Sequence, residues 1–379
     1  YGLQILNPTI FLAACVIICA IISIATGSSW TTSATVGIAL IGIASALDIS
    51  LGMTAGAVLS GAYFGDKLSP MSDTTNLAPA MAGTDLFTHI KYMTLTTVPT
   101  IIITLIVFII IGFTLEPSGT ADTEVILRDI EKTFTITPWL FLVPVIVIIL
   151  IIKKTPPLIA LLVGTLLGAV AALIFQPDLV VLAAGGEKLD FTTAYKGVMN
   201  AITVKTNIPT ENAILADLFS AKGMAGMLGT IWLIICAMVF GGVMDAIGAL
   251  ARISKALLTL FNTTFGLFAS TVASCLALNL TASDQYLAIV VPGKMYSKAF
   301  KDKGLAPENL SRTLEDAGTV TSVLVPWNTC GAYQSGVLGV SVLDYFVFAI
   351  FNWLSPFMTL LFAAFNIKIR QLKDAGKEA

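Results

Sequence analysis

The chain has 379 residues, of which 56% are hydrophobic and only 12% are charged. Soluble domains carry about 25% charged residues, so the composition excludes an ordinary soluble protein and predicts an all-α polytopic membrane protein. The net charge of −2 gives no indication of a nucleic-acid partner, and the single histidine, His89, excludes catalysis by a histidine pair.

Apolar runs recur along the whole chain. A helix needs about 20 apolar residues to cross a membrane. On this criterion we expect straight spans at residues 7–25, 92–113, 138–152, 156–175, 223–245 and 342–365. Shorter or more polar stretches lie at residues 31–46, 50–63, 254–275, 281–292 and 316–339. These predict discontinuous helices or re-entrant hairpins, which membranes tolerate only where protein or a water-filled cavity surrounds them.

Basic residues crowd three connecting segments, at Lys153-Lys154, between Lys294 and Arg312, and in the tail at 366–379. Lysine and arginine are enriched in cytoplasmic loops, so we expect a cytoplasmic C-terminus and an external loop at 176–222. The chain begins at Tyr1 rather than at a methionine, and we therefore expect an N-terminal part to precede it.

Two segments of the chain align with each other without a gap, residues 31–50 and 262–281, and this alignment puts Asp48 onto Asn279. From the loop charges, residues 92–113 should cross the membrane outward and the equivalent residues 342–365 inward. Opposite orientation of equivalent spans is typical of inverted-topology repeats. We expect repeat cores at 26–113 and 256–365. Scaffold helices at 138–175, and a scaffold helix and turn at 223–255, would complete a single membrane transport domain over 1–379.

Two polar clusters interrupt the apolar background, one in "GDKLSPMSDTTNLAP" from Gly65 and one in "LEDAGTVTSVLVPWNTCG" from Leu314. Both contain proline and an asparagine beside threonine. Carboxylate, hydroxyl and amide oxygens suit a hard cation, whereas histidine is absent from both stretches and their one cysteine, Cys330, has no cysteine or histidine at a zinc-binding spacing. The expected ion-binding residues are Ser72, Asp73, Thr74, Thr75 and Asn76 with Glu315, Ser322, Asn328 and Thr329. Among them, Na⁺ itself is expected at Asp73, Thr74, Asn76, Asn328 and Thr329. Secondary candidates are Asp48, Asp66, Asp284 and Asp316.

Each cluster also has a simpler interpretation. The first could be a solvated loop outside the membrane, and Glu315 and Asp316 could merely end the basic cytoplasmic loop. Asp48 and Asp284 could make hydrogen bonds between packed helices, and His89 could be an interfacial residue.

A buried carboxylate favours its protonated form, whereas a bound cation favours the ionised form. One carboxylate can therefore hold Na⁺ or a proton but not both, which is the simplest coupling for antiport. Asp73 is the first choice for this group, with Asn328, Thr329 and Glu315 completing the site from the other repeat. No resident cofactor is expected, since Na⁺ is the transported ion.

The motif "GAYFGDKLSPMSDTTNLAPAMAGTDLFTHI" at 61–90 closely resembles the signature of NhaC-type sodium/proton antiporters. "TIWLIICAMVFGGVMDAIG" from Thr230, "DQYLAIVVPGKMY" from Asp284 and "LEDAGTVTSVLVPWNTCGAY" from Leu314 are also similar to that family. The resemblance runs from near Thr26 to the end of the chain. It implies the ion-transporter superfamily, inverted repeats, a bacterial plasma membrane location, and exchange of cytoplasmic Na⁺ for external H⁺.

Other functions remain open beside Na⁺/H⁺ antiport. Some similar sequences couple Na⁺ and H⁺ to malate/lactate exchange. A carrier of organic anions would bind the carboxylate of its substrate with a cationic side chain or helix N-termini. Lys67 is the only cation near the clusters. An intramembrane aspartyl protease would need glycine where Tyr63 stands. Carboxylates in matched broken helices fit a transporter with alternating access better than they fit a channel. The expected partners are Na⁺, H⁺ and the lipid bilayer, and a homodimer is one expected assembly.

Overall fold

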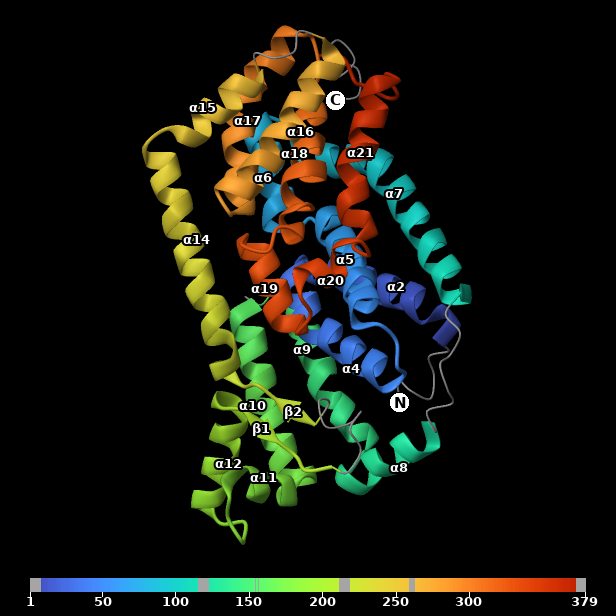
Figure 1. The fold of residues 1–379 in the computed structure, drawn as a ribbon, viewed down its shortest axis with the longest axis vertical. Coiled ribbons are helices and arrows are strands. Elements are labelled where there is room, and N and C mark those ends of the chain that lie inside the picture. The colour runs from blue at the N-terminus through green and yellow to red at the C-terminus, as the bar shows by residue number, and fades with distance from the viewer. Residues whose placement is uncertain are drawn as a thin grey trace. The chain divides into compact units, whose positions relative to one another are not determined.

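The computed structural model describes residues 8–114, 123–153, 155, 157–210, 219–258 and 263–372 (Figure 1). In these ranges the elements are almost all helical, and the one sheet pairs β1 (Thr206–Asn207) with β2 (Ser220–Ala221). Five of the described helices are long and apolar enough to cross a membrane, and a bent pair of helices would make a sixth span. The prediction of an all-α membrane protein is confirmed.

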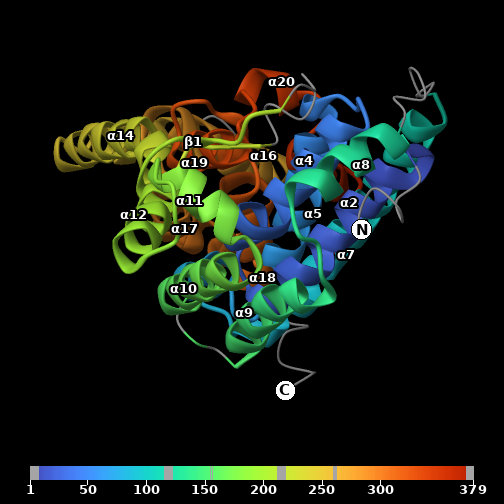
Figure 2. The same ribbon diagram turned by 90° about the horizontal axis from the view of Figure 1, so that it is seen from below.

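The chain divides into two compact units. The first comprises Tyr1–Pro8, Ile41–Ser50 and Leu115–Gly229. Its helices are α8 (Thr123–Thr133), α9 (Leu142–Ile152), α10 (Pro157–Phe175), α11 (Pro177–Ala184) and α12 (Phe191–Thr203), seen from below in Figure 2. A 107° bend separates α10 from α11, where Pro177 begins a new helix. Within this unit, the segment expected as a long loop at 176–222 carries α11, α12 and the β1–β2 pair.

The second unit comprises Thr9–Leu40, Leu51–Thr114 and Thr230–Ala379. Its first half holds α2 (Pro8–Thr26), α3 (Ser29–Thr32), the π-helical turn η1 (Ser33–Gly37), α5 (Leu51–Leu68), α6 (Asp73–Ala82) and α7 (Leu86–Thr114), while α4 (Ile38–Ala46) passes from this unit into the first. Helices α2 and α5 pack backbone to backbone. A Cβ on Gly61 would come within 2.2 Å of the Val16 carbonyl oxygen, and one on Gly65 within 2.4 Å of the Ala20 oxygen. These two glycines therefore serve helix packing.

The second half of this unit is less regular. Its elements are α14 (Leu228–Ala246), α15 (Ala249–Leu258), α16 (Thr264–Thr281), α17 (Gln285–Asp302), α18 (Pro307–Leu314), the π-helical turn η4 (Glu315–Thr319), the 3₁₀ turn η5 (Ser322–Leu324), α19 (Thr329–Leu338), α20 (Val342–Phe346) and α21 (Ile350–Ala364). The expected straight span at 342–365 is wrong, because the chain breaks between α20 and α21. Gly52 and Gly56 of α5 approach the backbone of Asp344 and Phe348, so the break packs against α5.

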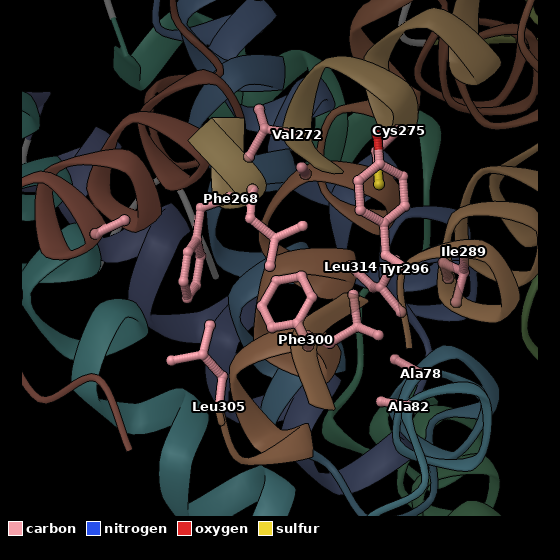
Figure 3. Close-up of a cluster of buried hydrophobic side chains, with 14 residues drawn as sticks. Ala78, Ala82, Phe268, Val272, Cys275, Ile289, Tyr296, Phe300, Leu305 and Leu314 are labelled. Carbon is pink, nitrogen blue, oxygen red and sulfur yellow. The ribbon is translucent and has the colours of Figure 1, made fainter. Parts of the chain in front are cut away.

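An apolar core fixes α6 against the second half of this unit (Figure 3). Phe268 of α16 and Phe300 of α17 meet edge to face with ring centroids 5.1 Å apart. Ala78 and Ala82 of α6 belong to the same buried cluster. Helix α6 is thereby held against α17 and α18, although some 200 residues separate them in the sequence.

The structure does not support the pairing of Asp48 with Asn279 in the alignment of the two repeats. Asp48 is exposed in the turn after α4 and has a left-handed backbone with φ of 54°. Asn279 is fully buried inside α16, and Ser283, in the turn after that helix, is the residue with a similar φ of 59°. The two residues therefore occupy different environments, because the apolar background of both helices permits a sequence alignment that the turns do not follow.

Candidate functional site

The polar stretch from Gly65 to Pro79 is divided between two helices. Asp66 and Lys67 lie in the last turn of α5, and Asp73 is the first residue of α6. Ser72 caps α6 by accepting the N–H of Thr75 at 3.4 Å. The Thr75 hydroxyl reaches back to the carbonyl oxygens of Asp66 and Lys67, each at 3.2 Å. The simpler interpretation of a solvated loop is therefore wrong for most of the stretch.

The second polar stretch is a buried break between helices. The chain leaves α18 through η4 and η5 and begins α19 at Thr329, after the helix cap Asn328. Side chains hold the carbonyl groups that this irregular backbone releases. The Nδ2 of Asn279 donates to the oxygen of Gly318 at 2.7 Å, and the Nδ2 of Asn352 donates to that of Val320 at 2.8 Å. Irregular backbone deep in the protein is thereby kept hydrogen-bonded.

An ion pair joins the two stretches. The Lys67 ammonium contacts Asp316, and both side chains are fully buried. Asp316 also accepts hydrogen bonds from the hydroxyls of Thr96, at 2.9 Å, and Thr359. The interpretation of Asp316 as the end of a basic loop is therefore wrong. Residues of α5, α7, η4 and α21 meet at this carboxylate, which supplies the hydrogen bonds that a buried pair needs.

Asp66 lies beside this ion pair and has a different set of partners. Its Oδ2 accepts the backbone N–H of Ser29 at 3.1 Å and the Ser29 hydroxyl at 2.6 Å, at the start of α3. Its Oδ1 has no hydrogen-bond partner in the described part of the chain. Asp66 also interacts electrostatically with Asp73. It therefore connects the buried charges with the start of α6.

Glu315 is fully buried one residue before Asp316. Neither of its carboxyl oxygens has a hydrogen-bond partner within the described ranges. It interacts electrostatically with Lys67, Asp66 and Asp316. Three buried carboxyl groups thus share one buried ammonium group, and that ammonium group is already paired with Asp316. The simpler interpretation of Glu315 as a loop residue is wrong.

Among the expected ligands at the start of α6, Ser72, Thr74 and Thr75 are buried, whereas Asp73 and Asn76 are exposed. Asp73 is exposed: its Oδ1 accepts the N–H of Thr74 at 2.8 Å, and its Oδ2 accepts the hydroxyl of Tyr286. Asn76 is exposed too, and its amide donates to the carbonyl oxygens of Pro70, at 3.0 Å, and Ser72, at 2.6 Å. The amide nitrogen of Asn76 therefore holds the turn.

The expected ligands near α19 meet the start of another helix. Asn328 accepts the N–H of Cys330 at 3.0 Å, and the Thr329 hydroxyl lies 3.5 Å from Oδ2 of Asp284. Asp284 caps α17, and Tyr286 two residues later contacts Asp73. The first residues of α17 therefore connect the two sets of expected ligands. Ser322 donates to the oxygen of Thr319 at 2.6 Å, and Asp48 belongs to the segment 41–50 of the first unit.

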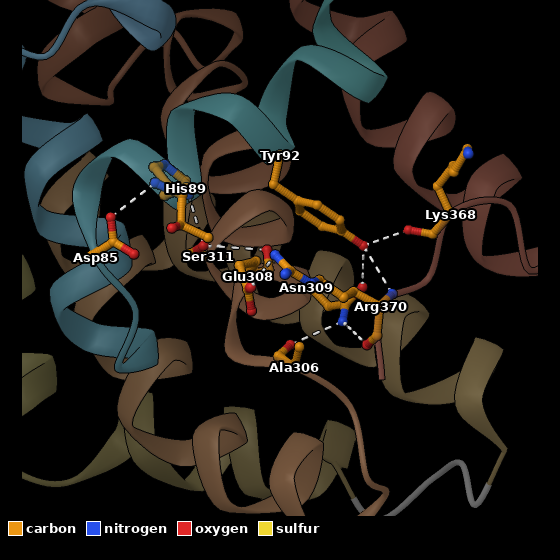
Figure 4. A network of polar contacts seen from close by, with 10 residues as sticks. Asp85, His89, Tyr92, Ala306, Glu308, Asn309, Ser311, Lys368 and Arg370 are labelled. Carbon is orange, nitrogen blue, oxygen red and sulfur yellow. Dashed lines mark hydrogen bonds and ion pairs between the residues drawn. The ribbon is translucent and has the colours of Figure 1, made fainter. Parts of the chain in front are cut away.

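A separate polar network surrounds the end of the described chain (Figure 4). His89 is fully buried, and its Nδ1 lies 2.7 Å from the Ser311 hydroxyl. Arg370 pairs with Glu308 at 2.9 Å. The Arg312 guanidinium is fully buried and has no hydrogen bond within the described residues. It lies over the ring of Tyr92, 4.6 Å from the centroid. Aromatic contact therefore accompanies this buried cation.

Sequence reasoning missed four partners in the charged site: Lys67, Ser29, Thr96 and Thr359. A signal existed for the last two, since each lies three residues from a proline in an apolar helix, Pro99 or Pro356. Lys67 was visible as the lysine inside the first cluster, but nothing in the sequence indicates that it meets Asp316.

Helices with apolar surfaces around a buried charged cluster are typical of multi-pass membrane transporters. The model of the Na⁺/H⁺ antiporter family matches residues 61–367. The chain is 38% identical to the Na⁺/H⁺ antiporter NhaC of Alkalihalophilus pseudofirmus over 369 residues, covering 97% of this chain and 77% of that protein. The malate-2H⁺/Na⁺-lactate antiporter of Bacillus subtilis is 34% identical over 371 residues, covering 97% and 74%. The chain belongs to the Na⁺/H⁺ antiporter family.

Proposed function

We propose that the protein exchanges Na⁺ for H⁺ across the bacterial plasma membrane. The observation that carries this proposal is the buried surplus of acidic groups. Asp66 and Glu315 are both buried, while the nearby ammonium of Lys67 pairs with Asp316. Unpaired charges are costly to bury, so these two carboxyl groups call for cations or protons. A site that must be neutralised by one or the other is suited to antiport.

Oxygen atoms suitable for Na⁺ cluster on the Asp66 side. Oδ1 of Asp66 is free within the described part, and the hydroxyl groups of Ser72 and Thr74 lie 3.1 Å from each other at the start of α6. Carboxylate and hydroxyl oxygens are ligands that hard cations prefer. We place the ion between Asp66 and this helix start, with Asp73, Asn76, Asn328 and Thr329 as the further ligands expected from the sequence.

Alternating access would come from movement of the broken elements around η4 and α6 against the plainer helices. Inverted repeats, a cytoplasmic C-terminus and a homodimer remain proposals of the same kind. The family motifs support the inverted repeats, and the loop charges support the cytoplasmic C-terminus.

The test is a pH-gradient assay in proteoliposomes that contain an internal pH dye. Na⁺ added outside should raise the internal pH, because Na⁺ enters as H⁺ leaves. Li⁺, K⁺, malate and lactate are tested separately in the same vesicles. A response to Na⁺ without organic acid supports the proposal, and strict dependence on an added organic acid contradicts it.

A second function, Na⁺- and H⁺-coupled exchange of organic anions, is favoured by one observation. Arg312 is a buried guanidinium without a hydrogen-bonding partner in the described part. Such a group can bind a carboxylate through two parallel hydrogen bonds. It precedes Glu315 by one helical turn. If malate or lactate is transported, Arg312→Gln should abolish the response to the organic acid.

A further inference from the structure

Among the described residues, only the Thr319 hydroxyl and the Lys67 ammonium, which is already paired with Asp316, would stabilise the charge of Glu315. It is fully buried in η4, and both of its oxygens lack a hydrogen-bond donor within the described ranges. The hydroxyl of Thr319 comes close to it and is itself without a described partner. An ionised carboxylate in such a place is costly. The group therefore needs a proton or a cation.

The two carboxyl groups differ in the number of oxygen atoms around them, and this number distinguishes a proton site from a sodium site. A hard cation takes several oxygen ligands. Such oxygens gather around Asp66, which meets Ser29 directly and lies beside the start of α6 with its hydroxyl groups. Glu315 has one hydroxyl group beside it. A proton needs only one oxygen, so Glu315 suits a proton and the Asp66 side suits Na⁺.

The charged groups that act on Glu315 are few. Lys67 and Asp66 reach it from α5, and Asp316 follows it in η4. The other elements packed against η4 are α6, α16, α17, α18 and α21. Of these, α18 buries Glu308 and Arg312; the buried titratable groups of the others are Cys275 and Tyr296. The electrostatic neighbourhood of Glu315 is therefore dominated by the three residues that adjoin the proposed Na⁺ site.

We infer that Glu315 is a proton-carrying site distinct from the Na⁺ site, and that electrostatic repulsion couples the two. The inference rests on the proposed function and replaces competition for one carboxylate with two neighbouring sites. Na⁺ arriving beside Asp66 adds one positive charge near Glu315 and favours release of its proton. When Na⁺ leaves, the proton returns. One charge leaves as one arrives, so the buried cluster keeps its total charge throughout.

The test measures Na⁺ affinity against pH for the purified full chain in detergent, by titration calorimetry with NaCl. In the wild type, displacement of one proton per Na⁺ makes the affinity rise by about tenfold per pH unit. Glu315→Gln should still bind Na⁺, but its affinity should become nearly independent of pH. Glu308→Gln is the matched control, because Glu308 is a buried glutamate seven residues earlier that pairs with Arg370. It should keep the wild-type slope.

Two further variants keep the test decisive. Glu315→Ala should show the same loss of slope and carries the test if the glutamine variant does not fold. Glu315→Asp, which retains a carboxyl group, should restore the slope. Proteoliposomes with Glu315→Gln should exchange labelled Na⁺ for Na⁺ without moving protons.

The results distinguish failure of the inference about Glu315 from failure of the proposed Na⁺/H⁺ exchange. A wild-type slope in Glu315→Gln overturns the inference, and so does loss of Na⁺ binding in folded Glu315→Gln, which would make Glu315 an ion ligand. If the wild type itself exchanges no Na⁺ for H⁺, the proposed function fails and the inference fails with it. Normal wild-type exchange with an unchanged slope in the variant refutes the inference alone.

Discussion

Replacing Lys67 with methionine should test how strongly the buried ion pair holds α5 to η4. The change removes the ammonium group but keeps a long apolar side chain. Asp316 then keeps the hydroxyl groups of Thr96 and Thr359 but loses its only described charged partner, while both residues are fully buried. Removing one member of a buried pair typically costs about 3–5 kcal/mol, because the other charge stays uncompensated.

The two remaining hydroxyl groups offset part of that cost, so we expect Lys67→Met to lose about 3 kcal/mol of unfolding free energy. Such a loss changes the unfolding equilibrium by about a hundredfold. The double variant Lys67→Met/Asp316→Asn should recover most of it, since no uncompensated charge from this pair remains. The assay is denaturant unfolding in detergent micelles, followed by tryptophan fluorescence.

The control is Lys91→Met, which removes an exposed lysine from α7. Exposed charges contribute little to stability, so its unfolding free energy should change by less than about 1 kcal/mol. The reasoning is refuted if Lys67→Met is as stable as this control. It is also refuted if the double variant is no more stable than Lys67→Met.

Three further predictions concern other parts of the second unit. Asp73→Asn should abolish Na⁺-dependent proton movement in proteoliposomes; normal movement would remove Asp73 from the ion site. Gly61→Val should reduce the yield of folded protein on size-exclusion chromatography, because its side chain would meet the backbone of Val16; a normal elution profile contradicts that packing. The Thr88 hydroxyl and N–H lower the pKa of Asp85, which is exposed before α7. Its ionised form stabilises the folded state above the usual aspartate range, so Asp85→Ala should show a small thermal destabilisation near neutral pH that disappears in acid.

The membrane class, the family and the two polar stretches were predictable from the sequence. The family motifs and the polar stretches each depend on residues close together in the chain. Membrane class follows from apolar content, and Ser72 and Asn328 stand where polar residues begin new helices. The Lys67–Asp316 pair was not predictable, since 249 residues separate its members. Only tertiary packing brings them together.

Two other errors have local causes. The break between α20 and α21 was missed because an apolar run looks the same whether it continues or turns against the glycines of α5. The pairing of Asp48 with Asn279 failed because small and apolar residues align in several registers. The alternative that Glu315 and Asp316 end a loop also failed, because they follow a basic segment in the sequence, yet η4 carries them into the protein interior.

We propose that the unpaired carboxyl groups of Asp66 and Glu315 carry the exchange. The most direct measurement compares the wild type with Asp66→Asn/Glu315→Gln in dye-loaded proteoliposomes after external Na⁺ is added without organic acid. We predict a rise of internal pH in the wild type and none in the folded double variant, while Glu308→Gln responds like the wild type. Exchange at the wild-type rate in the double variant would contradict the account.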